Sequence, residues 1–385
     1  MTCKKFDVVV SGGGIIGTAS ALSLAKVYEN VLLIERGDIL SKEVSPKNEQ
    51  VFMLSESSIN FLNDLISNKI YSSGELYPVK TMNLFDDKHN RLILDSDVVE
   101  KKCLGYTVKK SFILGSLHDA LAKSNVTLRG CDEVVKIDLF ESESVLSLEK
   151  SSKITTGLLV VADGSRSKLR DLTGIRCDLK DFDQTAIVCQ LDVDQTKFCA
   201  YQWFQSGGGV MALLPTTESS FTLVWSISSE MSRKIISGGT CVLRDELMKV
   251  IGRTFKNINI VSDIEFFPIT SIITKDVINS SLVLVGEAAN SIHPMAGQGL
   301  NLGLRDVKIL SDILGKEQGK SMQASLRAYK RQRAEKVAIM SSLTNFMHYV
   351  FSENSFICSK ARELGFISFS KNNLLKRLAI KIATN

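Results

Sequence analysis

The stretch FDVVVSGGGIIG, residues 6–17, decides the fold of this chain. Its first half, Phe6 to Val10, is apolar and β-branched, as expected of a buried parallel strand. The glycines that follow open a helix of small residues, expected at about residues 15–28, and a second apolar strand is predicted at 31–34. Strand, glycine turn, helix and strand in this order predict a right-handed βαβ unit at the start of a doubly wound sheet.

The glycines of this turn have the spacing G-x-G-x-x-G. Gly12 allows the sharp turn, Gly14 lets the backbone approach a pyrophosphate at the helix N-terminus, and Gly17 lets helix and strand pack closely. Glu35 ends the second strand, where a carboxylate can accept the hydroxyls of an adenosine ribose. A glycine turn without a ligand is the alternative, but the register of all four features favours a dinucleotide site. The motif does not separate NAD from FAD.

Two later segments have a related form. VVADGSRSKLR, residues 160–170, runs from a buried strand into an Asp-Gly turn, which taken alone is usually just a turn. LVLVGEAANSIHPMAGQGLNLGLRD, residues 282–306, runs from a buried strand through a Gly-rich loop into a helix. That helix start is either a second anion-favouring N-terminus, suited to a flavin ring that becomes anionic on reduction, or a site of close packing.

Length and composition set the broad class. A chain of 385 residues predicts two or three units, and 44% hydrophobic with 23% charged residues excludes a disordered or fibrous protein. No apolar run approaches the roughly 18 residues of a transmembrane helix, and the N-terminus has no apolar signal region. We expect a cytoplasmic protein. The 8 cysteines and 4 histidines are dispersed, with no C-x-x-C pair, so we predict no metal site.

The net charge of +5 is concentrated at the C-terminus. Residues 359–385 contain six basic side chains and one acidic one, a balance of +5, so the rest of the chain is near neutral. A protein that binds nucleic acid through a broad basic surface does not have this distribution, and we predict no nucleic-acid partner.

The C-terminal segment also has helical periodicity. Leu374, Leu375, Leu378 and Ile382 are predicted to share one helical face, with basic residues elsewhere. Such a helix suits peripheral contact with an anionic surface such as the inner membrane, or contact with other proteins of a biosynthetic complex. It equally suits packing on its own domain with a solvated basic side.

Taken together, the three glycine-containing segments resemble the aromatic-hydroxylating flavoprotein monooxygenases of the para-hydroxybenzoate hydroxylase type, and more narrowly the ubiquinone-biosynthesis hydroxylases. The resemblance extends over nearly the whole chain. The stretches that carry the narrower resemblance are HPMAGQGLNLGLRD (293–306), ALLPTTESSFTLVWS (212–226), SKLRDLTGI (167–175) and DFDQTAIV (181–188).

The resemblance implies an α/β fold: a Rossmann-like FAD-binding domain with a parallel sheet, interrupted by an antiparallel β-sheet substrate domain, plus C-terminal helices. We expect FAD-binding parts at residues 1–80, 106–180 and 271–350, a substrate-domain hairpin at 81–105, a substrate-binding sheet at 181–270 and a basic helical tail at 351–385.

The resemblance also implies a set of FAD-binding residues. Those near the ADP half, the pyrophosphate, the ribityl chain and the ring are Gly12, Gly14, Gly17, Glu35, Asp163, Gly164, Gly286, Glu287, Pro294, Gly297 and Gly299. His293 is a weak candidate for an acid or base, because beside Pro294 it more simply orders the loop. No other catalytic side chain is expected, because the flavin carries the chemistry.

Several positions depart from the family pattern. Glu287 stands where the family has Asp, and Asn290 stands where it has His. Gln50 occupies the place of an arginine close to the flavin, and Lys109-Lys110-Ser111 replaces acidic or amide and Arg residues. These departures put the rate of turnover in doubt more than they do cofactor binding.

The implied activity is hydroxylation of a polyprenylated phenol in ubiquinone biosynthesis. The resemblance implies O2 as co-substrate, NAD(P)H as the electron donor and a flavin hydroperoxide as the oxidant. One alternative is a flavin-dependent reductase or dehydrogenase of a prenyl lipid. Another is a catalytically weak FAD-binding scaffold of the biosynthetic complex. The aromatic side chains of the substrate sheet, Trp203, Phe204, Phe221 and Trp225, either face the substrate or form ordinary sheet core.

Overall fold

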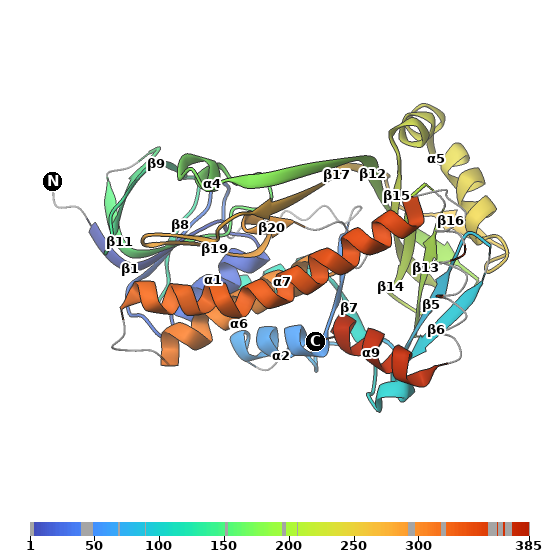
Figure 1. The fold of residues 1–385 in the computed structure, drawn as a ribbon, viewed down its shortest axis with the longest axis horizontal. Helices are drawn as coiled ribbons and strands as arrows, with labels where there is room; N and C mark the ends of the chain where they lie inside the picture. Colours follow the sequence, from blue (N-terminus) through green and yellow to red (C-terminus); the bar gives the residue numbers. More distant parts are fainter. Residues whose placement is uncertain are drawn as a thin grey trace.

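The computed structural model describes residues 4–39, 49–67, 70–88, 90–150, 153–194, 198–205, 207–291, 297–316, 321–352, 360, 365 and 372–384. Two large sheets lie at opposite ends of an elongated molecule, as Figure 1 shows. The first is the sheet that contains the N-terminal strand, and the second is formed mainly by the middle of the chain.

The first sheet has eight strands and a parallel centre. Its path runs through β18 (Ile278–Asn279), β19 (Leu282–Leu284), β11 (Ile154–Val161), β1 (Lys4–Ser11), β2 (Val31–Ile34) and β8 (Thr127–Arg129). Two antiparallel strands, β10 (Ser144–Leu148) and β9 (Val134–Leu139), extend it from the first half of β11. The second half of β11 pairs with β19 instead.

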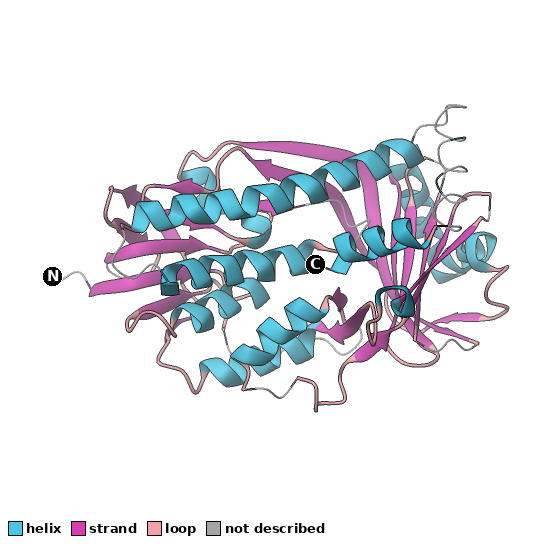
Figure 2. Cartoon of the chain, turned by 60° about the horizontal axis from the view of Figure 1, so that its bottom comes forward, coloured by secondary structure: helices cyan, strands magenta, loops and turns pink. Residues whose placement is uncertain are grey.

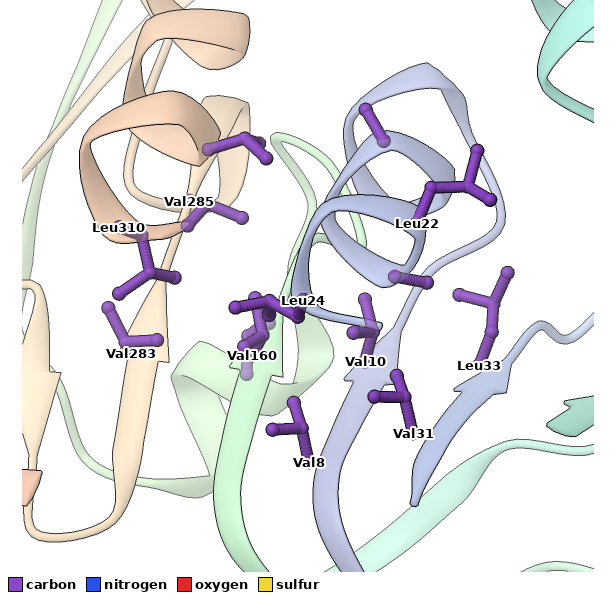
Figure 3. Close-up of a cluster of buried hydrophobic side chains, with 14 of the residues drawn as sticks. Val8, Val10, Leu22, Leu24, Val31, Leu33, Val160, Val283, Val285 and Leu310 are labelled. Carbon is purple, nitrogen blue, oxygen red and sulfur yellow. The ribbon is translucent and has the colours of Figure 1, made fainter. Parts of the chain in front are cut away.

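The central strands form the main hydrophobic core. Val8, Val10, Val160 and Val283 are completely buried; Figure 3 shows Val8 and Val10 below the helix α1 (Ile15–Leu24) and Val283 close to Leu310. Burial on both faces explains why these strands are continuous apolar runs without alternation. Each fully buried valine or leucine contributes roughly 1.5–3 kcal/mol of transfer free energy.

Helices from distant parts of the chain cover this sheet. α1 packs against α3 (Lys110–Leu121), α6 (Gly299–Lys316) and α2 (Glu56–Leu65), and α6 packs against the long α7 (Met322–Ser352). The short elements α4 (Lys168–Leu172) and η2 (Gly286–Ala288) follow β11 and β19. Figure 2 shows α7 extending from the parallel sheet to the antiparallel one, so this helix ties the two ends of the molecule together.

The second sheet has nine strands. They are β20 (Asn290–Ser291), β17 (Glu265–Thr274), β12 (Cys177–Val193), β15 (Ser220–Ser228), β14 (Val210–Pro215), β13 (Cys199–Phe204), β5 (Thr81–Phe85), β6 (Arg91–Asp95) and β16 (Ile258–Ile260). Most pairs are antiparallel, and the β5–β6 hairpin joins through a parallel pair with β13. The long strands β12 and β17 run between the two ends of the molecule (Figure 1).

The aromatic residues of this sheet are core. Trp203, Phe221 and Trp225 are buried in one cluster against α5 (Ser229–Ile251). Phe204 lies in a different cluster, where its ring stacks on Phe351 at the end of α7 with a centroid distance of 4.4 Å. These side chains are therefore part of the packing that holds the sheet between its helices.

A third sheet, which the sequence pattern did not predict, lies between the other two. It consists of β3 (Val51–Leu54), β7 (Gly105–Lys109) and β4 (Tyr77–Val79), with β7 in the centre. The 3-10 helix η1 (Ser96–Val99) precedes β7 and contacts the C-terminal helix α9 (Asn373–Thr384).

α9 packs on its own protein by a residue outside its predicted apolar face. Ile380 is 2% exposed, whereas Leu374 and Leu378 are 75% and 56% exposed. The guanidinium of Arg377 donates to the carbonyl oxygen of Val98 at 2.7 Å. The side chain of Ile382 lies outside the described residues. Among the helices that the structure describes, none is long and apolar enough to cross a membrane.

Candidate functional site

Four parallel strands end at the same level of the first sheet. Ser11 is in register with Ile34 and with Val161, and Val161 is in register with Leu284. The glycine turn, Glu35, the Asp-Gly segment and the Gly-Glu segment therefore leave one edge of the sheet side by side. The carboxyl edge of a doubly wound sheet is where such folds bind ligands.

The glycine turn is too tightly packed for side chains at two positions and open at a third. Gly12 has φ +112°, and a Cβ there would lie 2.4 Å from the carbonyl oxygen of Ala162. A Cβ on Gly17 would lie 1.8 Å from the carbonyl oxygen of Gly12. A Cβ on Gly14, at the N-terminus of α1, would have no atom within 4 Å in the part of the chain that the structure describes. Gly14 therefore faces open space at a helix N-terminus that has no side-chain cap.

Glu35 bends over this turn. One carboxylate oxygen accepts a hydrogen bond from the backbone N–H of Gly13, and the other accepts from the N–H of Gly37 at 3.0 Å. The two bonds fix the side chain beside the turn. Each carboxylate oxygen has further acceptor capacity, which is suited to hydroxyl groups of a bound molecule.

Asp163 has an acceptor atom that nothing in the described protein satisfies. Its Oδ2 accepts from the N–H of Leu169 at 3.3 Å, while its Oδ1 is buried and has no hydrogen-bond partner among the described residues. Burial raises the pKa of this carboxyl, against the hydrogen bonds from Ser167 and Leu169 that lower it. A buried, unpartnered acceptor at the edge of a site is suited to a donor group on a ligand.

Glu287 lies in the first turn of η2, after β19. Its side chain is exposed to solvent, yet the surrounding protein desolvates it enough to raise the pKa of its carboxyl. The nearby Lys110 opposes this effect and lowers the pKa. A Cβ on Gly299, at the start of α6, would lie 3.7 Å from Glu287 Oε1, so α6 begins beside this carboxylate.

Buried polar residues that the sequence analysis did not single out hold these segments together. Arg170 is buried and donates from Nη1 to the carbonyl oxygens of Ser165 at 3.2 Å and Ala288 at 3.3 Å, which joins the Asp-Gly and Gly-Glu segments. Asp306 accepts from the N–H of Gly286 at 3.0 Å and from Arg333 Nε at 2.8 Å.

Arg170 and Asp306 are the last residues of the segments 160–170 and 282–306. A charged residue after a strand and a glycine turn is the sequence feature that could have indicated their role. Neither residue is a candidate for binding, because their charged groups are occupied in holding backbone. They position the residues at the site.

The remaining predicted site residues lie at the same end of the sheet or outside the described residues. A Cβ on Gly164 or Gly297 would have no atom of the described residues within 4 Å. His293 and Pro294 lie outside the described residues. Asn290, which stands where the family has His, accepts from the N–H of Thr274 at 3.0 Å and so has a local role between β20 and β17.

These observations fit a flavin dinucleotide. Among the described residues, Gly14, Gly164 and Gly297 are open positions, so a ligand can approach their backbone. Glu35 and Asp163 supply acceptors for its hydroxyl or N–H groups. In the parts of the chain that are described, no group of three or more His, Cys, Asp and Glu residues is arranged to hold a metal ion.

Comparisons with known proteins agree with this arrangement. A family model described as "FAD binding domain" matches residues 5–342. The 3-demethoxyubiquinol 3-hydroxylase of Escherichia coli (strain K12) is 27% identical over 393 residues, which span 100% of this chain and 99% of that protein. The predicted resemblance to ubiquinone-biosynthesis hydroxylases is thus confirmed.

Two solved structures share the fold. The p-nitrophenol 4-monooxygenase PnpA from Pseudomonas putida DLL-E4 has a TM-score of 0.79 and 16% identity, with 99% of each chain covered. HpxO from Klebsiella pneumoniae, complexed with FAD and uric acid, has a TM-score of 0.76 and 15% identity, with 99% of this chain and 96% of that chain covered. The predicted fold class is confirmed.

Proposed function

The chain belongs to the family of FAD binding domains, and on that basis we propose that it is a monooxygenase that hydroxylates the aromatic ring of a polyprenylated phenol in ubiquinone biosynthesis. The observation that carries the proposal is the convergence of three separate segments at one sheet edge, level with Glu35. The similarity to the E. coli hydroxylase over the whole chain supports the choice of substrate class.

In this proposal the described residues hold FAD along the strand ends. The N-terminus of α1 at Gly14 receives the pyrophosphate, and Glu35 accepts the ribose hydroxyls. Asp163 uses its free acceptor near the pyrophosphate, and Glu287 contacts the ribityl chain. Gly297 and Gly299, before and at the start of α6, line the ring. The same proposal places Gly12, Gly17, Gly164 and Gly286 around the cofactor; Pro294, also predicted to line the ring, lies outside the described residues.

FAD, when bound and reduced, supplies the activation of O2, and the protein contributes binding, orientation and the exclusion of water. Membership of the family implies O2 and an aromatic substrate, and we expect NAD(P)H as the reductant. The start of α6 presents backbone N–H groups that favour negative charge at the ring. We also propose that the nine-stranded sheet forms the substrate side. Its β5–β6 hairpin spans residues 81–95 of the expected 81–105, and its other strands extend beyond the expected 181–270, to Cys177 and Thr274.

The test is to purify the full chain, record its flavin spectrum, and follow O2 uptake and product mass with NAD(P)H and a short-prenyl phenol. We expect a bound flavin and a product heavier by one oxygen atom, derived from O2. Oxidation or reduction of the substrate without added oxygen would favour a reductase or dehydrogenase. Bound flavin with no turnover under any donor would favour a scaffold. A protein without affinity for FAD would refute the proposal.

We further propose that α9 makes peripheral contact with an anionic membrane, where a prenylated substrate resides. Its exposed Leu374 and Leu378 lie on a helix whose Arg377 and Lys381 are also exposed. Exposed leucines with neighbouring basic side chains suit the interface of an anionic bilayer. The contact of Ile380 with the protein core keeps the helix on its own domain at the same time.

Sedimentation with vesicles tests this contact. We expect the full chain to bind vesicles that contain phosphatidylserine or phosphatidylglycerol and to bind neutral vesicles more weakly. Replacement of both Leu374 and Leu378 by Asp should lower the partition coefficient about tenfold, since it removes apolar contact and adds repulsion. Unchanged partition of this variant would refute the contact.

A further inference from the structure

Gln50 and Lys110 come together although they are 60 residues apart. In the small sheet Val51 of β3 is in register with Lys109 of β7, so residues 50 and 110 are next to this pair. The N–H of Lys110 donates to the carbonyl oxygen of Gln50 at 2.8 Å, and Lys110 Nζ donates to Gln50 Oε1 at 3.2 Å. Backbone and side chain both hold Lys110 against Gln50.

The same region is attached to the start of α6. Asn301, buried in the first turn of α6, donates from Nδ2 to the carbonyl oxygen of Met53 at 2.9 Å and accepts from the N–H of Ser55 at 2.9 Å. These bonds place β3 beside the start of α6, where a Cβ on Gly299 would lie 3.7 Å from Glu287 Oε1. The positive charge of Lys110 lowers the pKa of the Glu287 carboxyl, against the burial that raises it.

A positive charge beside the bound flavin would change its redox potential. A flavin ring becomes anionic on reduction, and a fixed cation beside it stabilises the reduced form more than the oxidised one. Gln50, at the position where an arginine is expected, is neutral and cannot do this. Lys110, within the run Lys109-Lys110-Ser111 that departs from the family pattern, carries the charge and contacts the Gln50 amide.

We propose that Lys110, held by Gln50, is the cation that faces the flavin ring, so that the positive charge of the site comes from the start of α3 and not from the start of β3. The inference rests on the proposed function, because it requires bound FAD. It assigns a binding role to a residue that the sequence analysis recorded only as a departure.

The experiment measures the two-electron midpoint potential of the bound flavin and the dissociation constant of oxidised FAD in full-length variants. For Lys110→Gln we expect reduced FAD to bind about tenfold more weakly relative to oxidised FAD, which lowers the potential by about 30 mV. Lys109→Gln is the matched control. It removes the same charge from the adjacent residue, whose exposed ammonium instead pairs with Glu75 at 3.7 Å, and its potential should equal that of the wild type.

A charge exchange sharpens the test. The double variant Gln50→Arg with Lys110→Gln returns the cation from the other side of the pair, and its potential should recover toward the wild-type value. Lys110→Arg keeps a cation at residue 110, so its midpoint potential should equal that of the wild type. If Lys110→Gln binds no flavin, the double variant is measured instead. Flavin bound by the double variant at the wild-type potential supports the proposal. Loss of flavin from the double variant, or a potential below that of the wild type, overturns it.

Two other results would overturn the inference. One is a potential in Lys110→Gln that equals the potential of the wild type. The other is an equal weakening of oxidised and reduced FAD, which would show that the charge acts on the pyrophosphate. In both cases the wild type still binds FAD, so the proposed function stands. A wild type that binds no FAD would instead refute the proposed function.

Discussion

The eight-stranded sheet brings backbone groups and few side chains to its functional edge, whereas the nine-stranded sheet is filled with aromatic side chains. At the first edge Gly12 and Gly17 leave no room for a Cβ, and Gly14 faces open space. In the second sheet Phe221 and Trp225 are buried against α5. In the proposed function the first sheet therefore binds FAD through the backbone of its open turns, while the packed aromatic core of the second sheet supports the substrate side.

Asp306→Ala should have the largest effect on the first region. It leaves the Arg333 guanidinium buried without its partner and the Gly286 N–H without its acceptor, so we expect a loss of about 4 kcal/mol in the free energy of unfolding, with loss of FAD. Urea denaturation and flavin absorbance measure both. The control is Asp312→Ala on the same helix, whose exposed pair with Lys308 should matter by less than about 1 kcal/mol. Equal losses in the two variants would contradict the role of Asp306.

Phe221→Ala tests the other region. The side chain is completely buried, so its truncation should cost about 3 kcal/mol of unfolding free energy. We expect the dissociation constant of FAD to change by less than about twofold, because this core lies away from the strand ends. Thermal unfolding and a flavin titration measure the two quantities. If the affinity fell together with the stability, the two sheets would not be separable in function.

Gly14→Ala should separate binding from folding. Its methyl group would enter the open space before α1, so we expect FAD to bind about tenfold more weakly while the stability of the apoprotein changes little. Gly115→Ala in α3 is the matched control, because a Cβ there also meets no atom within 4 Å. As an interior helix position it should gain about 0.5–1 kcal/mol and leave FAD affinity unchanged. An unchanged affinity of Gly14→Ala for FAD would show that the pyrophosphate does not bind at Gly14.

Asp163→Asn should have the smallest effect and a characteristic pH dependence. Burial raises the pKa of Asp163 above its usual 3.8, so the folded protein holds this proton more tightly than the unfolded chain. Below pH 3.8 the carboxyl is protonated in both states, so its burial does not lower the free energy of unfolding. As pH rises from 3.8 through the raised pKa of the folded state, burial of the carboxylate lowers the free energy of unfolding. We expect Asp163→Asn to raise the unfolding temperature of the apoprotein by about 1–3 °C at pH 8 and not at pH 4. A difference that is the same at both pH values would contradict the assignment.

The sequence predicted the parts of the site that depend on local geometry. The glycine turn, the helix after it and the acid at the end of β2 follow from spacing within 30 residues, because turn conformation and strand periodicity are local properties. The helix α9 shows the limit. Its periodicity predicted a helix, but Ile380, outside the predicted apolar face, is the residue that packs against the core.

What the sequence by itself determined is the parallel sheet with its dinucleotide turn, and through its motifs the family and the cofactor. The tertiary structure alone decided that Lys110 meets Gln50, that Arg170 joins Ser165 to Ala288, and that β3, β7 and β4 form a sheet of their own. Residue spacing encodes the direction in which a side chain leaves its own strand or helix. Which distant side chain it meets depends on how whole elements pack, and that is a sum over many contacts that no single segment contains.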